Sequence, residues 1–323
     1  MKRLLSFYFI VIALLFSLQG CIHEYPVMKG KKPADVAVDL NIDLSFDISW
    51  QQLPYVVDFS SRAIEKRHRF IIEALSEGTS VCRDEVWLSD EDFRKGRFRH
   101  QFSKSLRPLT HDIALWYDRT DQNSSSHFTT DNLSDITLQE RATDKEEVTQ
   151  CAYANTRIDV AEFAETNEVS TIEMQHAGAR FQIVATDIQE FIQAQRPALL
   201  QGDSFSVQIL FSEGSAHSFN IYDGSVTRKN EKLEYNGELW LPFDDYDELK
   251  IAEGFLFCNN EEFVTMQLLI YNSARMIVSE TEQFSFPVKR GVITRVSGDF
   301  LTFPLEGAFS IDHIWEGEIE III

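Results

Sequence analysis

Residues 36–48, with the sequence VAVDLNIDLSFDI, alternate strictly between apolar and polar or small side chains. Every second residue from Val36 to Ile48 is apolar, and three aspartates stand among the residues between them. Successive side chains of a β-strand point to opposite faces of its sheet. A period of two sustained over this segment therefore predicts a β-strand with one buried face.

Weaker forms of the same alternation follow along the chain, separated by short polar or glycine-bearing segments as in an antiparallel sheet. Ile172 and Met174, followed by the apolar positions 181, 183 and 185, outline a strand pair that bends at Gly178. The other expected strands are 69–75, 97–102, 113–117, 205–210, 263–271, 276–286, 288–296 and 317–323.

One short helix is expected over 187–194. Asp187 is placed to cap its start, and Glu190 stands three residues later, as in a capping box. The apolar positions 188, 191 and 192 fall on one helical face. The pair Arg196-Pro197 is expected to end the helix.

The pattern predicts a mostly β fold made of two antiparallel β-sandwich domains in tandem, with few short helices. A chain of 323 residues with 25 phenylalanines can supply two such cores. We place the boundary near residue 168, in an acidic stretch. Residues 35–168 would form the N-terminal domain and residues 169–323 the C-terminal domain.

The charge balance excludes one class of partner. Asp and Glu number 51 and Lys and Arg number 30, which gives a net charge of −21. A surface this negative repels phosphate backbones, so we expect no nucleic-acid binding.

The N-terminus is typical of an exported lipoprotein. A basic start at Lys2-Arg3 precedes an apolar run over 4–18, which is shorter than the roughly 20 residues of a transmembrane helix. The run ends at Leu18-Gln19-Gly20-Cys21, which is similar to a bacterial lipobox. We expect residues 1–20 to be a signal peptide, Cys21 to carry acyl chains such as palmitate, and residues 21–34 to form a tether. Two or three acyl chains give stable membrane anchoring.

No motif predicts catalysis. The sequence lacks a G-x-S-x-G elbow, a P-loop and a G-x-G-x-x-G loop, and paired carboxylates carry no specificity in so acidic a chain. We therefore expect no enzyme, no cofactor and no catalytic residue. The remaining cysteines, Cys82, Cys151 and Cys258, have no metal or redox spacing and are expected to be buried free thiols.

Two groups of residues contain side chains of the types that bind metal ions. His100 and His111 lie on or near neighbouring predicted strands, yet none of the eight histidines has a zinc-site spacing. The segment 244–248 concentrates four carboxylates but lacks the calcium-loop spacing. Satisfied histidines and a solvated acidic loop are the favoured interpretations, so no metal is expected.

The aromatic residues can be interpreted either as buried core residues or as exposed rings that stack on a sugar. Trp116 and Tyr117 sit in an alternating strand, where a core position is favoured over an exposed ring that stacks on a sugar. Trp87, Trp240 and Trp315 lie at strand or loop edges, where carbohydrate binders often place rings.

Several segments resemble a known family. His23-Glu24-Tyr25-Pro26 follows the lipobox cysteine closely, and His111-Asp112-Ile113-Ala114-Leu115-Trp116-Tyr117-Asp118 is similar to a strand of the family's first domain. Segments 179–187, 288–294, 298–302 and 317–321 resemble the strands of its second domain. The family is that of the two-domain lipoproteins of Bacteroidales related to fimbrial anchor and minor fimbrial subunits.

The resemblance implies two transthyretin-like β-sandwiches held at the outer membrane, and so at the cell surface or in a fimbrium, through acylated Cys21. It also implies a role in cell adhesion at the base or tip of a fimbrium, with fimbrial subunits as partners that assemble by β-strand addition. The closing residues Ile319, Ile321 and Ile323 are favoured as the last strand of the second domain over a donated strand. The family's Tyr-x-Gly-Asn segment is replaced here by Tyr153-Ala154-Asn155, which leaves the inter-domain contact open.

Two functional hypotheses follow. The leading one is a fimbrial anchor, tip or minor subunit, which an open sheet edge with an apolar groove would favour. The alternative is a surface glycan-binding lipoprotein of a nutrient-uptake complex, which a coplanar set of exposed Trp and Tyr rings would favour.

Overall fold

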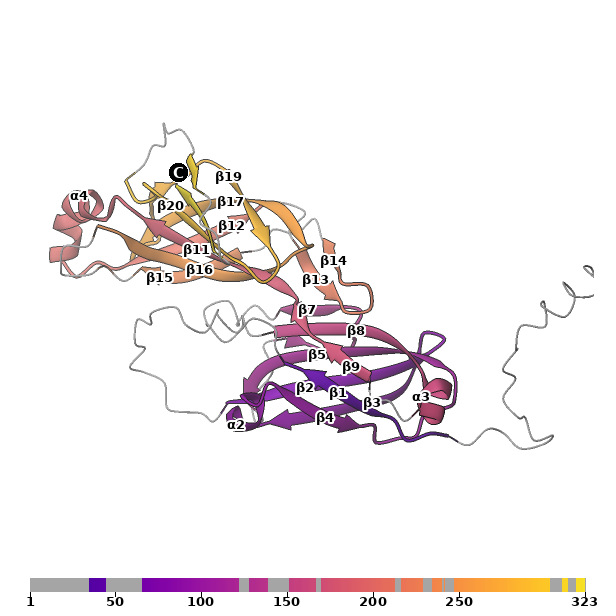
Figure 1. Cartoon of the computed structure of the whole chain (residues 1–323). Coiled ribbons are helices and arrows are strands. Elements are labelled where there is room, and N and C mark those ends of the chain that lie inside the picture. The colour runs from indigo at the N-terminus through magenta and orange to yellow at the C-terminus, as the bar shows by residue number, and fades with distance from the viewer. Residues whose placement is uncertain are drawn as a thin grey trace, which may run out of the picture.

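The computed structural model describes residues 35–44, 66–121, 128–138, 151–166, 170–212, 216–228, 234–239, 241, 247–302, 310–312 and 318–322. The fold is mostly β, and three short helices occur among these residues. Two β-sandwiches lie side by side, the first in indigo and magenta and the second in orange and yellow (Figure 1). The predicted fold class is confirmed.

The first sandwich consists of a three-stranded and a five-stranded sheet, in the orders β4-β1-β9 and β10-β8-β5-β2-β3. Leu40 and Ile42 of the smaller sheet pack against Phe70, Ile72 and other residues of the larger one. Its elements are β1 (Asp39–Asp43), β2 (Lys66–Ser76), β3 (Thr79–Leu88), α2 (Asp90–Phe93), β4 (Arg97–Gln101), β5 (Thr110–Asp121), β8 (Cys151–Asp159), α3 (Val160–Thr166), β9 (Ser170–Glu173) and β10 (Gln175–His176).

The second sandwich pairs a sheet in the order β16-β11-β20-β22-β21 with one in the order β15-β12-β17-β18, where β19 also pairs with β17. Phe181 and Phe211, one from each sheet, meet edge to face in its core. Its elements are β11 (Gly178–Ala185), α4 (Ile188–Leu200), β12 (Phe205–Phe211), β15 (Glu234–Leu239), β16 (Leu249–Phe257), β17 (Glu261–Asn272), β18 (Ile277–Glu280), β19 (Phe284–Lys289), β20 (Ile293–Gly298), β21 (Ser310–Asp312) and β22 (Glu318–Ile322).

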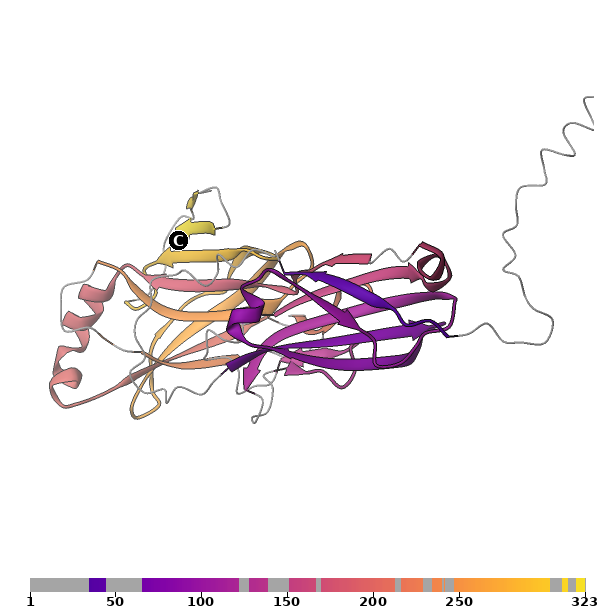
Figure 2. The same ribbon diagram turned by 60° about the horizontal axis from the view of Figure 1, so that its bottom comes forward.

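A fifth sheet joins the two sandwiches. Between β5 and β8 the chain forms β6 (Phe128–Thr129) and β7 (Ile136–Leu138), and between β12 and β15 it forms β13 (Ala216–Asn220) and β14 (Ser225–Arg228). β7 pairs antiparallel with β13, so the two hairpins build one sheet in the order β14-β13-β7-β6. This sheet lies where the two sandwiches meet (Figures 1 and 2).

The alternating segment behaves as predicted where the structure describes it. Val38, Leu40, Ile42 and Leu44 are each at most 1% exposed, while the residues between them reach solvent. Residues 45–48 lie outside the described residues. Six further predicted strands correspond to β2, β4, β5, β12, β17 and β22.

The strand pair predicted over 172–185 is wrong. Within the described residues its strands pair elsewhere, since β9 runs parallel to β1, β10 joins β8, and β11 lies between β16 and β20. Gly178 allows close approach to β16, because a Cβ there would collide with the carbonyl oxygen of Leu256. The strands predicted at 276–286 and 288–296 are rearranged into β18, β19 and β20, with Gly291 at φ +73° in the last turn. A domain boundary near residue 168 stays a prediction.

The helix differs from prediction at both ends. Asp187 occupies the N-cap position but makes no capping bond, so the predicted capping box is wrong. Its carboxylate instead accepts hydrogen bonds from the backbone N–H groups of Leu301 and Thr302, at 2.9 and 2.6 Å. The helix also continues through Pro197 to Leu200, because residues 198 and 199 pack against the second core.

Candidate functional site

A polar groove of about 810 Å³ opens on the sheet face of the first sandwich that is turned away from the first core. Its floor is made by two adjacent cross-strand rows of the large sheet. One row runs from Arg83 through Glu73 and Ala114 to Asn155, and the next contains Leu75, Asp112 and Arg157.

The walls come from the two joining hairpins. The β6–β7 hairpin contributes residues 131–134, where the backbone N–H and the hydroxyl of Ser134 both donate to Asn132 Oδ1, at 3.0 and 2.8 Å. The β13–β14 turn contributes Tyr222. Because each wall belongs to the shared sheet, the shape of the groove depends on the way the sandwiches are joined.

Glu73 lies at the base of the groove and is 6% exposed. Its Oε2 accepts a hydrogen bond from the Tyr222 hydroxyl at 2.6 Å and lies 3.6 Å from Arg83 Nη1. Burial, together with the bond to Glu73, raises the pKa of Tyr222. Tyr222 therefore stays a neutral hydroxyl that donates to the carboxylate.

The mouth of the groove is charged and exposed. Arg157 Nε donates to Asp112 Oδ1 at 2.7 Å, and the side chains are 72% and 46% exposed. An exposed pair of this kind contributes little to folding stability. Its hydrogen-bonding groups are thus accessible to a ligand at small cost.

Arg290 fixes the second sandwich to the first. Its Nη1 donates to the Tyr153 hydroxyl at 2.7 Å, and its Nε and Nη2 donate to the carbonyl oxygen of Cys258 at 3.0 and 2.9 Å. Nη2 also donates to the carbonyl oxygen of Gly224 at 2.5 Å. The guanidinium lies over the rings of Tyr153 and Phe219, 5.4 and 5.1 Å from their centroids.

Asn155 adds a second tie at the same junction. Its side-chain amide donates to the carbonyl oxygens of Ile221 and Tyr222, at 3.0 and 2.7 Å. Tyr153 and Asn155, whose inter-domain role the sequence left open, are therefore both inter-sandwich contacts. A third hydrophobic core, to which Trp116, Phe128, Phe219, Phe255 and Phe257 belong, fills the junction.

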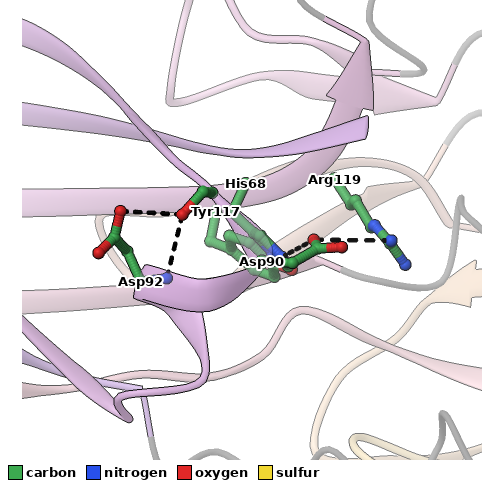
Figure 3. Close-up of polar contacts among 6 residues, drawn as sticks. His68, Asp90, Asp92, Tyr117 and Arg119 are labelled. Carbon is green, nitrogen blue, oxygen red and sulfur yellow. Dashed lines mark hydrogen bonds and ion pairs between the residues drawn. The ribbon is translucent and has the colours of Figure 1, made fainter. Parts of the chain in front are cut away.

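A buried histidine cluster in the first sandwich is a second candidate. His68 is 4% exposed, its Nδ1 lies 2.8 Å from the Tyr117 hydroxyl, and its Nε2 lies 2.9 Å from Asp90 Oδ1. Figure 3 shows Asp90 between His68 and Arg119, whose Nη2 lies 3.8 Å from the carboxylate. The ring of Phe93 stacks on the imidazole with centroids 3.8 Å apart.

This cluster has a structural role. Burial lowers the pKa of His68 to about 4, against a smaller opposing effect of the hydrogen bond to Asp90. A neutral imidazole suits both contacts, since Nε2–H donates to the carboxylate and Nδ1 accepts from the tyrosine hydroxyl. The rings of His68 and Tyr117 are shielded from solvent, at 4% and 1% exposed, and the contact between His68 and Asp90 holds α2 on the sheet.

The two histidines that the sequence analysis considered as a metal-binding pair have separate hydrogen-bond partners. His100 Nε2 lies 3.0 Å from Asp84 Oδ2, while His111 Nε2 donates to the carbonyl oxygen of Arg107 at 3.0 Å. Residues 244–246 of the acidic segment lie outside the described residues, and Glu248 pairs with Arg295. In the described part of the chain, no group of three or more His, Cys, Asp or Glu side chains is placed to hold a metal ion.

Trp116 and the three cysteines that the sequence predicted to be buried are buried in the structure. Trp116 is fully buried and its indole N–H donates to Asp118 Oδ2 at 3.1 Å, so it is no sugar platform. Cys82, Cys151 and Cys258 are free and buried, as expected. Cys21, Trp240 and Trp315 lie outside the described residues, and within those residues no helix is long and apolar enough to cross a membrane.

A family model described as a family of unknown function, DUF6562, matches residues 33–323. The chain belongs to the DUF6562 family. A search of curated proteins finds no significant match to this DUF6562 chain.

Several solved structures align with this chain at low sequence identity. A protein of Bacteroides thetaiotaomicron proposed to be an adhesin aligns over 77% of this chain and 80% of its own, with 12% identity and a TM-score of 0.42. A proposed cell adhesion protein of Parabacteroides distasonis aligns over 89% and 97%, with 8% identity and a TM-score of 0.42. A fimbrial assembly protein of Parabacteroides distasonis aligns over 82% and 92%, with 10% identity and a TM-score of 0.36.

Proposed function

We propose that this protein is a lipid-anchored outer-membrane protein that serves as an anchor, tip or minor subunit of a fimbrium in cell adhesion. The observation that carries the proposal is the combination of the lipobox ending at Cys21 with two β-sandwiches joined by a shared sheet. A tethered, firmly joined pair of domains suits a protein that must transmit force between a membrane and a partner. We further propose that each sandwich is transthyretin-like.

Assembly would proceed by strand addition at a sheet edge. β3 is ten residues long and, within the described residues, pairs on one side only, with β2. An extended segment from a partner can add to such an edge, where main-chain hydrogen bonds supply affinity and alternate side chains supply register. By contrast, β22 pairs with β20 and β21 in its own sheet, which supports its role as part of the second sandwich.

The membrane anchor is tested by Cys21→Ser in the full-length chain. We expect wild-type protein to incorporate labelled palmitate and to fractionate with the outer membrane, because several acyl chains hold it there. The variant should incorporate no label and appear in the soluble fraction. Unchanged labelling and membrane association of the variant would overturn the anchor at Cys21.

A further inference from the structure

We propose that the polar groove of the first sandwich binds the sugar rings of an uncharged or weakly charged glycan. This inference deepens the proposed adhesion function and rests on it only for the biological meaning of the binding. The groove is the space of about 810 Å³ over Glu73, Asp112 and Arg157, walled by Asn132 and Tyr222. Its volume lies within the range of small-molecule sites.

The chemistry of the lining favours hydroxyl groups. Carboxylates accept hydrogen bonds only, guanidinium groups donate only, and amides do both. The groove presents carboxylates at Glu73 and Asp112 and guanidinium groups at Arg83 and Arg157. Asn132 adds the NH₂ group of its amide as a donor, because its Oδ1 already accepts two hydrogen bonds from Ser134. Neighbouring hydroxyls of a sugar ring each donate and accept, so they can satisfy such alternating groups at once.

The charge of the lining argues against strongly ionic ligands. Three carboxylates, Glu73, Asp112 and Asp131, face two guanidinium groups, Arg83 and Arg157. A polyanion would be repelled by the three carboxylates and a polycation by the two guanidinium groups, and this repulsion offsets the attraction to the opposite charges. A neutral polyhydroxyl ligand avoids both costs.

Hydrogen bonds within the protein hold both walls of the groove in place without a ligand. Tyr222 is held by Glu73 on one side, and its backbone carbonyl is held by Asn155 on the other. The opposite wall is tied internally through Asn132 and Ser134. Walls that are fixed in advance reduce the entropy lost on binding, which favours recognition of a flexible ligand.

The test is binding of the detergent-solubilised full-length protein to an array of neutral and sialylated oligosaccharides, followed by calorimetric titration with the oligosaccharide bound best. Arg157→Ala and Asp112→Ala each remove an exposed groove side chain with little effect on folding. Each should weaken binding about tenfold or more, the usual effect of losing a hydrogen bond to a charged group. The control is Arg99→Ala, which breaks a similar exposed pair with Asp39 on another sheet and should leave affinity unchanged.

A third groove variant fills the space with a bulky side chain. Ser80 lines the groove and is exposed, and Ser80→Trp should abolish binding by occlusion. Wild-type protein that binds no oligosaccharide on the array would overturn the proposal, as would binding that survives all three groove variants. Either result leaves the fimbrial proposal standing, because membrane anchoring and subunit association are measured separately.

Discussion

At the residue scale, a buried ion pair shows why some contacts of the core cannot be predicted from the sequence. Arg69 and Asp118 face each other on β2 and β5, and Arg69 Nε donates to Asp118 Oδ1 at 2.9 Å. The carboxylate is 1% exposed and also accepts the indole N–H of Trp116. The apolar run around Trp116 predicted its burial, whereas no sequence pattern links two residues that are 49 positions apart.

Asp118→Ala should destabilise the protein by roughly 3 kcal/mol, because it leaves the partly buried Arg69 and the Trp116 N–H without their shared acceptor. Chemical denaturation of variant and wild type measures this difference. The control is Asp112→Ala, which breaks an exposed Asp–Arg pair and should change the free energy of unfolding by less than about 1 kcal/mol. Equal losses in the two variants would contradict the assignment.

His68 makes the folding stability depend on pH. Its folded-state pKa of about 4 lies below the ordinary value of 6.5, so the unfolded chain binds the proton more readily. The contribution of neutral His68 is therefore complete above about pH 6.5 and is lost as the pH falls toward 4, by roughly 2.5 kcal/mol at pH 4.5.

Denaturation at pH 7.5 and pH 4.5 tests this contribution. The loss of stability between the two values should be smaller by that amount in His68→Gln than in wild type. Because the comparison is of pH differences, a constant cost of the substitution cancels. Identical pH dependence of the two proteins would exclude His68 as the group responsible.

At the element scale, periodicity predicted the strands with one buried face and missed several others. β3, β8 and the strands from β13 to β16 carry a weaker alternation. Helix α4 shows a second limit of prediction from local sequence. The side chain of Asp187, the predicted cap, accepts hydrogen bonds from the distant backbone N–H groups of Leu301 and Thr302 and does not cap the helix. Tertiary contacts override local patterns in each case.

Substitution of Gly224, in the turn between β13 and β14, tests the inter-sandwich junction. Its φ is +67°, and an added Cβ would lie 2.6 Å from the Tyr153 hydroxyl, the group that accepts from Arg290. Gly224→Ala should therefore cost both the strain of the left-handed backbone and the displacement of Tyr153. We expect a loss of about 2 to 4 kcal/mol in the free energy of unfolding.

The matched control is Gly202→Ala. Gly202 has φ +82° but has nothing within 4 Å of the added Cβ, so only backbone strain of about 1 to 2 kcal/mol applies. Denaturation curves of both variants separate the two costs. A loss at Gly224 no larger than that at Gly202 would show that the Tyr153–Arg290 contact does not depend on this turn.

At the scale of the whole molecule, the sequence indicated two sandwiches but not how they are joined. β7 pairs with β13 through Ile136 with Phe219 and Thr137 with Ser218, residues that are about 80 positions apart in the chain. No local sequence pattern indicates a contact between residues so far apart. The groove shares this origin, because its floor and one wall belong to the chain of the first sandwich while the wall at Tyr222 belongs to that of the second. The proposed lipobox at residues 18–21, by contrast, is a local motif that can be identified from the sequence alone.

The shared sheet and the third core predict that the two sandwiches unfold together. Separation would expose Trp116, Phe128, Phe219 and Phe257, which are all at most 3% exposed in the folded chain. Differential scanning calorimetry of the full chain should show one cooperative transition. Two resolved transitions would mean that the junction is weaker than its contacts imply.

The central claim is that the protein is a membrane-anchored part of a fimbrium. Its most direct test is crosslinking of the native lipoprotein in outer membranes, followed by pull-down and mass spectrometry of the crosslinked partners. We predict recovery of polymeric fimbrial subunits, with crosslinks that map to sheet-edge strands. Recovery of a transporter and glycosidases in their place would contradict the claim and assign the protein to a nutrient-uptake complex.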